Sequence, residues 1–325
     1  MVNANNKTLY GIEDPNIRYI WAGYHFVVLI SSIVGDTIIL VASIKYNALK
    51  LSHFILATIQ HIAVADLTLS VFYTFPEMVS LIADGWILGD TFCYVRDPIS
   101  YFCVPALTLL VCVMTTGKWI QLKYPFRAWN WTREQAQKTC AAVWVFSLIA
   151  PGIVVAVARK DIYFDYNIYN CVYVHFGTKQ DHTLLINVAF EVFLVIPNVV
   201  IVATSTMLLV EARKNLRQGE SLNWRGVSTV LLTALIFSLA SLPTVLFILS
   251  KYIIGISSFT VEIEFRRVAA FLKQINIMAN IYIYTMTVPS FREFISSRVR
   301  FIARALSQPA SHHTERRPLL ESVPE

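Results

Sequence analysis

Charged residues are scarce in this sequence. Asp, Glu, Lys and Arg make up 15% of its 325 residues, hydrophobic residues make up 56%, and the mean hydropathy is +0.55. Soluble domains usually carry about 25% charged residues, so the chain lacks the polar surface of an ordinary soluble fold. Its net charge of +6 is spread between apolar stretches rather than over one soluble face, which excludes a nucleic-acid-binding domain.

Several functional motifs are missing as well. The first residues are polar and contain no basic segment followed by an apolar run, so no cleavable signal peptide is predicted. The sequence has no zinc-type histidine cluster, nucleophile elbow or phosphate-binding loop, which argues against an enzyme. It also has no internal repeat and no helix broken at mid-membrane, so a transporter is kept only as a remote alternative.

Long apolar runs are what the sequence has in abundance. Several stretches approach the length of about 20 residues that crosses the hydrocarbon core of a bilayer. Helices satisfy their own backbone groups in lipid, whereas an open strand does not. We therefore predict an all-α membrane protein, a bundle of seven transmembrane helices with a short C-terminal amphipathic helix. The predicted helices lie at about residues 19–44, 54–82, 93–122, 136–157, 184–210, 227–254 and 268–288.

The distribution of basic residues predicts the orientation. Roughly twice as many lysines and arginines fall on the side of the C-terminus as on the other side, and the positive-inside rule makes that side cytoplasmic. The N-terminus is then extracellular, where the sequon at Asn6 is open to glycosylation, although such triplets also arise by chance. The predicted parts are an extracellular segment 1–18, the helical domain 19–288, an amphipathic membrane-surface helix 289–306 and a disordered tail 307–325.

Ionisable residues inside the predicted spans are candidate functional residues, because a charge in hydrocarbon is costly. Glu77 and Lys273 both fall in outer halves of their helices, and we predict that they interact directly or through a ligand. The alternative is a salt bridge that only neutralises the two charges.

A second group of polar residues is predicted at greater depth. On the last span, residues 273, 276, 280 and 284 share one helix face, so a polar stripe faces the bundle interior. Asp66 and Glu77 are eleven residues apart, about three turns, and we place them on one face of the second span. The polar core then holds either a sodium ion near Asp66 or a purely structural hydrogen-bond network. Its predicted members are Asp36, Asp66, Asn276 and Asn280.

Taken in order, these residues resemble the rhodopsin-like, or class A, G-protein-coupled receptors. The resemblance covers about residues 35 to 294 and rests on several anchors rather than one motif. They are Gly35-Asp36, Ala63-Val64-Ala65-Asp66-Leu67, Trp86-Ile87-Leu88-Gly89 before Cys93, Trp144, Pro151, Pro197, Phe237, Pro243, Asn280-Ile281-Tyr282-Ile283-Tyr284 and Pro289-Ser290-Phe291.

The resemblance implies roles for particular residues and partners. It implies a disulfide between Cys93 and Cys171 and a sodium-linked carboxylate at Asp66. The implied partners are an extracellular ligand, a heterotrimeric G protein, arrestin, a receptor kinase and membrane lipid. The residues implied in activation and G-protein coupling are Lys118, Trp119, Phe126, Phe237, Pro243 and Tyr284.

The chain also departs from the family pattern. Gly117-Lys118-Trp119 stands where the family has Asp-Arg-Tyr, and a lysine is not a planar bidentate donor. We therefore expect no ionic lock of the family type. Ser241 replaces a tryptophan and Ile281 replaces the proline of the last helix. A decoy receptor that binds ligand without signalling remains an alternative.

The expected ligand is a small polar molecule or a short peptide. Amine-binding members of the family carry an Asp on the third helix, and this chain has Ser100 there. The predicted ligand-binding residues are Glu77, Ser100, Lys273 and Gln274. A light-sensing, opsin-like receptor is the alternative, but Gln274 occupies the position of the retinal-binding lysine. Lys273 precedes it, and one residue turns a helical side chain by roughly 100°.

Overall fold

A computed structural model describes residues 15–44, 51–124, 132–149, 152, 162–165, 170–173, 191–219, 224–253 and 259–307. Helices make up almost all of the described chain. They are α1 (Pro15–Ile44), α2 (His53–Leu69), η1 (Ser70–Thr74), α3 (Phe75–Ala83), α4 (Asp90–Lys123), α5 (Arg133–Ser147), η2 (Glu191–Val195), α8 (Ile196–Arg217), α9 (Trp224–Ile253), α10 (Phe259–Thr287) and α11 (Pro289–Ser307).

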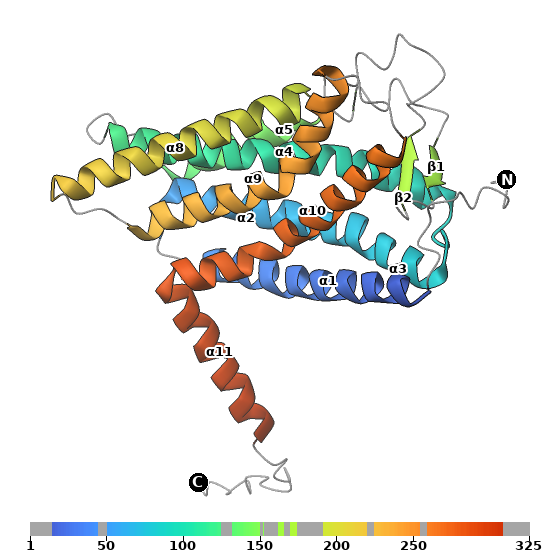
Figure 1. The fold of residues 1–325 in the computed structure, drawn as a ribbon. Helices are drawn as coiled ribbons and strands as arrows, with labels where there is room; N and C mark the ends of the chain where they lie inside the picture. The colour runs from blue at the N-terminus through green and yellow to red at the C-terminus, as the bar shows by residue number, and fades with distance from the viewer. Residues whose placement is uncertain are drawn as a thin grey trace, which may run out of the picture.

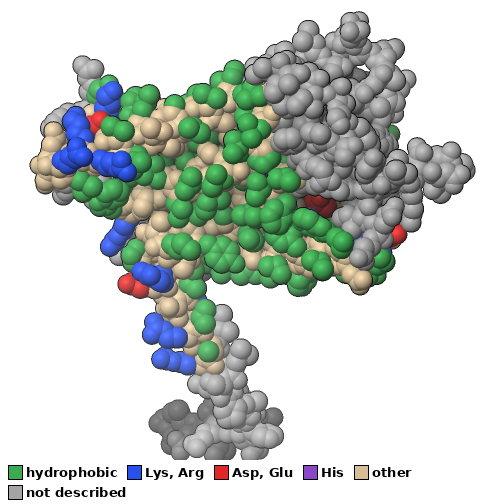
Figure 2. Space-filling model, viewed as in Figure 1, with side chains coloured by type: hydrophobic (Ala, Val, Ile, Leu, Met, Phe, Trp, Pro, Cys, Tyr) green, Lys and Arg blue, Asp and Glu red, His purple; other side chains and the backbone are tan. Residues whose placement is uncertain are grey.

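The long helices pack side by side into one bundle (Figure 1). α1 contacts α2, α3 and α10, whereas α4 lies inside the bundle and contacts α2, α5, α8 and α9. Five of the described helices are long and apolar enough to cross a membrane. Apolar side chains cover much of the bundle face seen in Figure 2, which fits helices that contact lipid. The predicted helical membrane bundle is thereby confirmed.

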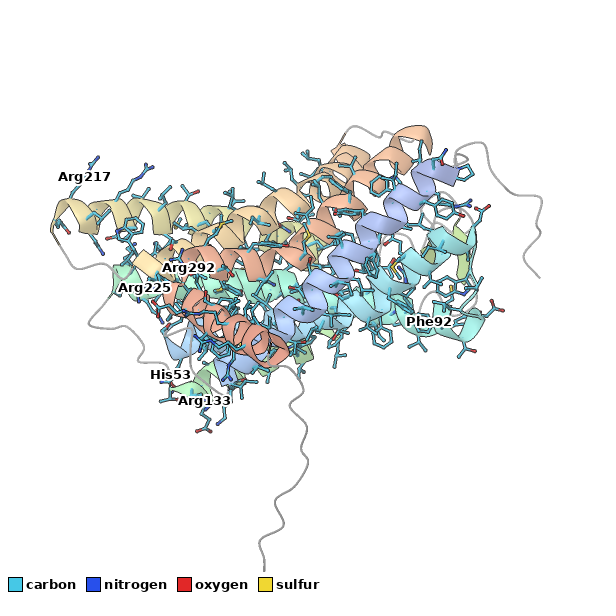
Figure 3. The ribbon with its side chains drawn as sticks, turned by 90° about the horizontal axis from the view of Figure 1, so that it is seen from below. His53, Phe92, Arg133, Arg217, Arg225 and Arg292 are labelled. Carbon is cyan, nitrogen blue, oxygen red and sulfur yellow. The ribbon has the colours of Figure 1, made fainter. Side chains whose placement is uncertain are left out.

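The two ends of the bundle differ, and we name them by their neighbouring elements. At the hairpin end, β1 (Ile162–Asp165) pairs antiparallel with β2 (Asn170–Tyr173), with Phe164 opposite Cys171. Backbone groups in this connecting hairpin pair with each other because no helix satisfies them there. Figure 3 places Phe92 at this end and Arg217, Arg225 and Arg292 at the opposite α11 end.

The second predicted span is not one uniform helix. It consists of α2, the π-helical turn η1 and α3 in direct succession. A π-helical turn holds one residue more than an α-helical turn would, so the three-turn spacing between Asp66 and Glu77 does not hold. Relative to a straight helix, Glu77 is turned by roughly 100°. Both side chains are nevertheless buried.

Close backbone approach between α1 and α10 depends on one glycine. A Cβ added to Gly35 would lie 2.8 Å from the Cβ of Ile281. Ile281 replaces the proline of the family motif, so the glycine makes room for its branched side chain.

α11 leaves the bundle at a steep angle (Figure 1). The apolar face of a membrane-surface helix is expected to meet lipid, but Phe291 is fully buried in the bundle core, and Phe294 and Ile295 pack against it. The first turn of α11 is therefore anchored in protein, since it follows α10 with only Val288 between them. Lys and Arg side chains gather along α11 and at the adjacent end of α8 (Figure 2).

Candidate functional site

A cluster of buried polar side chains joins α1, α3 and α10 near the hairpin end. Nε2 of His25 lies 3.3 Å from Oε2 of Glu77, which is an ion-pair distance. Nε2 of Gln274 donates to the same carboxylate oxygen over 3.2 Å, and Thr74 Oγ1 donates to Oε1 of Gln274 over 2.8 Å. Nδ1 of His25 donates to the carbonyl oxygen of Trp21 over 2.8 Å. Because both ring nitrogens face acceptor oxygens, the geometry suits a protonated imidazolium.

The predicted direct contact between Glu77 and Lys273 is wrong. In the described part of the chain, Glu77 is paired with His25 and Gln274. The ammonium of Lys273 instead lies 3.9 Å from the ring centroid of Tyr73. The reason is local: η1 shifts the face of the helix, so that Tyr73 meets Lys273 while Glu77 lies between His25 of α1 and Gln274 of α10.

A second cation meets the same tyrosine. The guanidinium carbon of Arg96, on α4, lies 4.8 Å from the centroid of the Tyr73 ring. Arg96 is the largest fully buried side chain of the described chain, with 1% exposed. Ser100 follows one turn later on the same face of α4, and its Oγ is buried without a hydrogen-bond partner. Arg96 and Lys273 thus approach the same ring, while Gln274 contacts Thr74 and Glu77. The ligand-binding role of Ser100, Lys273 and Gln274 stays a prediction.

An ion pair and a disulfide-bonded cysteine lie near the ends of α1, α3 and α4. NH1 of Arg18, near the start of α1, lies 2.6 Å from Oδ1 of Asp84. Asp84 caps the end of α3 in the left-handed conformation, with φ 55°. Cys93 is disulfide-bonded, whereas Cys103, Cys112 and Cys140 are free. Its predicted partner Cys171 lies in β2, which contacts α4, and the pairing stays a prediction.

The deeper polar core contains two carboxylates. Asp36 and Asp66 are 1% and 0% exposed. Asn280 Nδ2 donates to Asp66 Oδ2, and Tyr284 Oη donates to Asn280 Oδ1 over 3.4 Å. The other oxygen of Asp66, Oδ1, is buried and has no hydrogen-bond partner. The donor to Asp66 is thus Asn280, while the predicted participant Asn276 is half-buried and makes no described contact with it.

Asp36 is linked to the first residue of η1 through two hydroxyl groups. Ser32 Oγ donates to Oδ2 of Asp36 over 2.7 Å, and Ser70 Oγ lies 2.6 Å from Ser32 Oγ. The two carboxylates are close enough to influence each other electrostatically. The unpaired oxygen of Asp66, with a second carboxylate in its electrostatic environment, is chemically suited to a hard cation, because such cations prefer oxygen ligands.

α8 and α9 are linked where the family resemblance expects a tryptophan. Ser241 Oγ donates to Oδ1 of Asn198 over 2.6 Å, and Asn198 Nδ2 donates to the carbonyl oxygen of Leu194 over 2.8 Å. Leu194 lies in the π-helical turn η2, and Ser241 lies one turn below Phe237, which is 7% exposed. Pro243 lies inside α9 just beyond them. A hydrogen bond thus joins the irregular turn of α8 to the proline region of α9.

Apolar packing dominates at the α11 end. A Cβ on Gly117 would overlap the ring of Phe54 from α2, and Phe54 is 1% exposed. Phe54 therefore fills the space that a carboxylate occupies in the family pattern. Lys118 extends toward α9, where its Nζ would lie 3.4 Å from a Cβ built on Gly226. The ammonium of Lys123 lies 5.0 Å from the centroid of the Trp119 ring.

Sequence reasoning missed three of these residues. His25 was not counted among the ionisable groups of the spans, although it lies well inside the first predicted one. Arg96 was counted among the basic residues on the extracellular side, although the predicted third span, residues 93–122, contains it and α4 begins even earlier, at Asp90. Phe54 carried no sequence signal, since the space beside Gly117 exists only in the packed bundle. Asn6 and Phe126 lie outside the described residues, as does the side chain of Cys171.

A bundle of long apolar helices around a buried polar core is the architecture of an integral membrane protein. Residues 35–284 match the family model described as 7 transmembrane receptor (rhodopsin family). The chain therefore belongs to the rhodopsin family of seven-transmembrane receptors, which confirms the resemblance read from its motifs and the expectation that it is not an enzyme.

Individual relatives are distant. The D(1A) dopamine receptor of Xenopus laevis is 24% identical over 239 residues, 70% of this chain and 51% of that protein. Dopamine receptor 1 of Drosophila melanogaster is 28% identical over 153 residues, 45% of this chain and 29% of that protein. The alpha-1A adrenergic receptor of Oryzias latipes is 25% identical over 122 residues, 37% of this chain and 26% of that protein. The chain thus spans about half the length of the first of these relatives.

Proposed function

We propose that this protein binds a small polar ligand at the hairpin end and activates a heterotrimeric G protein at the α11 end. The observation that carries the proposal is a series of buried polar side chains through the bundle. It begins with Glu77 and Gln274, passes through Asp66 and Asn280, and reaches Tyr284. Family membership supports the same direction of signalling.

The ligand region is the cluster around Tyr73. Glu77, Ser100, Lys273 and Gln274 offer a carboxylate, a hydroxyl, an ammonium and an amide within one buried region. Such a mixture recognises polar groups by charge and hydrogen bonding, and leaving one of those groups unpaired is costly.

The membrane orientation is part of the proposal. Basic side chains gather at the α11 end, and the positive-inside rule then makes that end cytoplasmic. Lys118 and Trp119 would meet the G protein there, whereas the buried Tyr284 would take part in activation from inside the bundle. Arrestin and a receptor kinase are proposed as further partners. α11 would lie on the inner membrane surface with its arginines near anionic lipid. A sodium ion bound at Asp66 is proposed for the deeper core.

A decoy receptor is the second candidate, because one observation favours it. Phe54 occupies the space beside Gly117, and Lys118 is directed toward Gly226, so the charge arrangement that the family uses for coupling is replaced by packing. Signalling would then require α2, α4 and α9 to separate without a carboxylate to release.

Nucleotide exchange distinguishes the two candidates. Membranes containing the protein are assayed with a panel of Gα subunits, beside mock membranes, Lys118→Ala and the control Lys123→Ala. Exchange above mock that changes in Lys118→Ala and persists in Lys123→Ala supports a signalling receptor coupled through Lys118. Absence of exchange from protein shown to be at the cell surface, with ligand bound, favours the decoy.

A further inference from the structure

We propose that His25 makes this receptor sensitive to extracellular pH, because a proton on its ring holds α1 against α3 beside the ligand region. This role rests on the proposed function, whose orientation places the hairpin end outside the cell. The proton is then a regulatory ligand of the receptor, and His25 is the residue that binds it.

The surroundings of His25 require a charged ring. Its Nδ1 lies 2.8 Å from the carbonyl oxygen of Trp21, and its Nε2 lies 3.3 Å from Oε2 of Glu77. A neutral imidazole carries only one N–H, so one of these two acceptors would face a lone pair instead of a donor. His25 and Glu77 are 4% and 6% exposed, so little water reaches the carboxylate to take the place of the ring. Loss of the proton therefore leaves a buried carboxylate with no cation beside it in the described part of the chain.

A second ion pair between the same segments serves as a reference that does not titrate. Arg18 lies seven residues before His25 on α1, and Asp84 lies seven residues after Glu77, so the two pairs are about two turns apart on each side. NH1 of Arg18 lies 2.6 Å from Oδ1 of Asp84. A guanidinium keeps its charge at any pH that a protein meets, whereas a histidine exchanges its proton near neutral pH. Of these two contacts, only the one made by His25 changes with pH in that range.

The groups around His25 and Glu77 differ from a histidine in their ordinary ionisation. The ring of Tyr24 lies 5.5 Å from that of His25, and a tyrosine ordinarily ionises at about pH 10. Thr74 of η1 and Gln274 of α10 carry no ionisable group. The nearby cations Lys273 and Arg96 approach the ring of Tyr73 instead. A response of this region to pH near neutrality is therefore assigned to His25.

The proton acts on the ligand region through Glu77. The carboxylate oxygen that faces His25 also accepts from Nε2 of Gln274 over 3.2 Å, and Gln274 accepts from Thr74 over 2.8 Å. Glu77 and Gln274 are two of the proposed ligand-binding residues. A protonated ring balances the charge of Glu77 and keeps these side chains in place, whereas a neutral ring turns a lone pair toward the carboxylate and weakens the contact between α1 and α3. The contact is therefore complete at lower pH and is lost as the pH rises past the point where His25 releases its proton.

The test compares thermal unfolding of the purified full-length protein in detergent between about pH 6 and about pH 9, at constant ionic strength. The melting temperature of the wild type should fall over this range by roughly 2–4 °C more than that of His25→Gln, which cannot exchange a proton at this site. Glu77→Gln should flatten the profile in the same way, because no charged carboxylate then faces the ring. His53→Gln is the matched control and should keep the wild-type profile, since His53 is exposed at the α11 end (Figure 3).

A fourth variant keeps the test decisive if the neutral variants do not fold. His25→Lys places a cation beside Glu77 throughout this pH range, so its profile should be flatter than that of the wild type. A wild-type profile parallel to that of His25→Gln or His25→Lys overturns the assignment, as does equal flattening by His53→Gln. Nucleotide exchange is recorded separately over the same range. A stability profile that depends on His25, without exchange at any pH, supports the proton site and counts against the proposed signalling function instead.

Discussion

The hairpin end and the α11 end of the bundle are stabilised by different kinds of interaction. At the hairpin end, Glu77, His25, Gln274 and Thr74 form a buried network in which polar atoms are matched with each other. At the α11 end, the ring of Phe54 packs against the bare backbone of Gly117. A polar network discriminates between charges, whereas tight apolar packing discriminates between shapes. At the end proposed to contact the G protein, the receptor thus has apolar packing where the family pattern has a pair of charged residues.

The largest expected effect breaks the packing at the α11 end. Gly117→Ala adds a Cβ that overlaps the Phe54 ring, so we expect a loss of about 1–3 kcal/mol of stability, as is usual for overpacking. Thermal unfolding in detergent measures it. Gly23→Ala is the matched control, since nothing lies within 4 Å of a Cβ there.

A double variant tests whether Phe54 is the cause. Phe54→Ala opens the space beside residue 117, so Gly117→Ala should cost less in that background than in the wild type. Equal cost in both backgrounds, or an effect of Gly117→Ala no larger than that of Gly23→Ala, would contradict the packing explanation.

A smaller effect concerns the polar core between the two ends. If sodium binds at Asp66, replacing N-methylglucamine chloride by sodium chloride at constant ionic strength should raise the melting temperature. The stabilisation is about 1.4 kcal/mol at a sodium concentration tenfold above Kd. Asp66→Asn should abolish the response, and Asp36→Asn should weaken it if both carboxylates take part. A response that survives in Asp66→Asn would place the ion elsewhere.

The smallest effect sharpens the description of the hairpin end. Glu77→Gln keeps an acceptor for Gln274 but removes the charge that faces His25, and we expect a loss of about 1 kcal/mol. Glu77→Ala should cost more because it leaves both partners without an acceptor. If Glu77→Gln is as stable as the wild-type protein, then the charge that faces His25 contributes nothing, and thermal unfolding would show this directly.

Contacts of polar residues could be predicted from the sequence only where the helix that carries them is regular. Asp66 and Asn280 were predicted to share a polar core, and they do, because each lies on a regular α-helical stretch whose period is readable. Glu77 was assigned the wrong partner because η1 interrupts that period, and no turn residue marks it.

The contacts at the α11 end could not be predicted from the sequence for a different reason. The missing charge pair was predicted from Gly117-Lys118-Trp119, but its replacement by Phe54 requires knowing how α2 and α4 approach each other. The burial of Arg96 was missed for the same reason, because the side of α4 that faces the bundle interior at this position depends on how the helices pack.

The π-helical turn Ser70–Thr74 also changes how this chain can be compared with others. The turn is equivalent to one inserted residue that no gap or unusual letter reveals. When this chain is compared with a relative whose second helix is uniform, the residues from the turn to Ala83 are therefore shifted by one position in space. The shift is present even where the two sequences align without a gap. Deleting one residue within the turn would realign the two helices and, in the same step, rotate Glu77 away from His25.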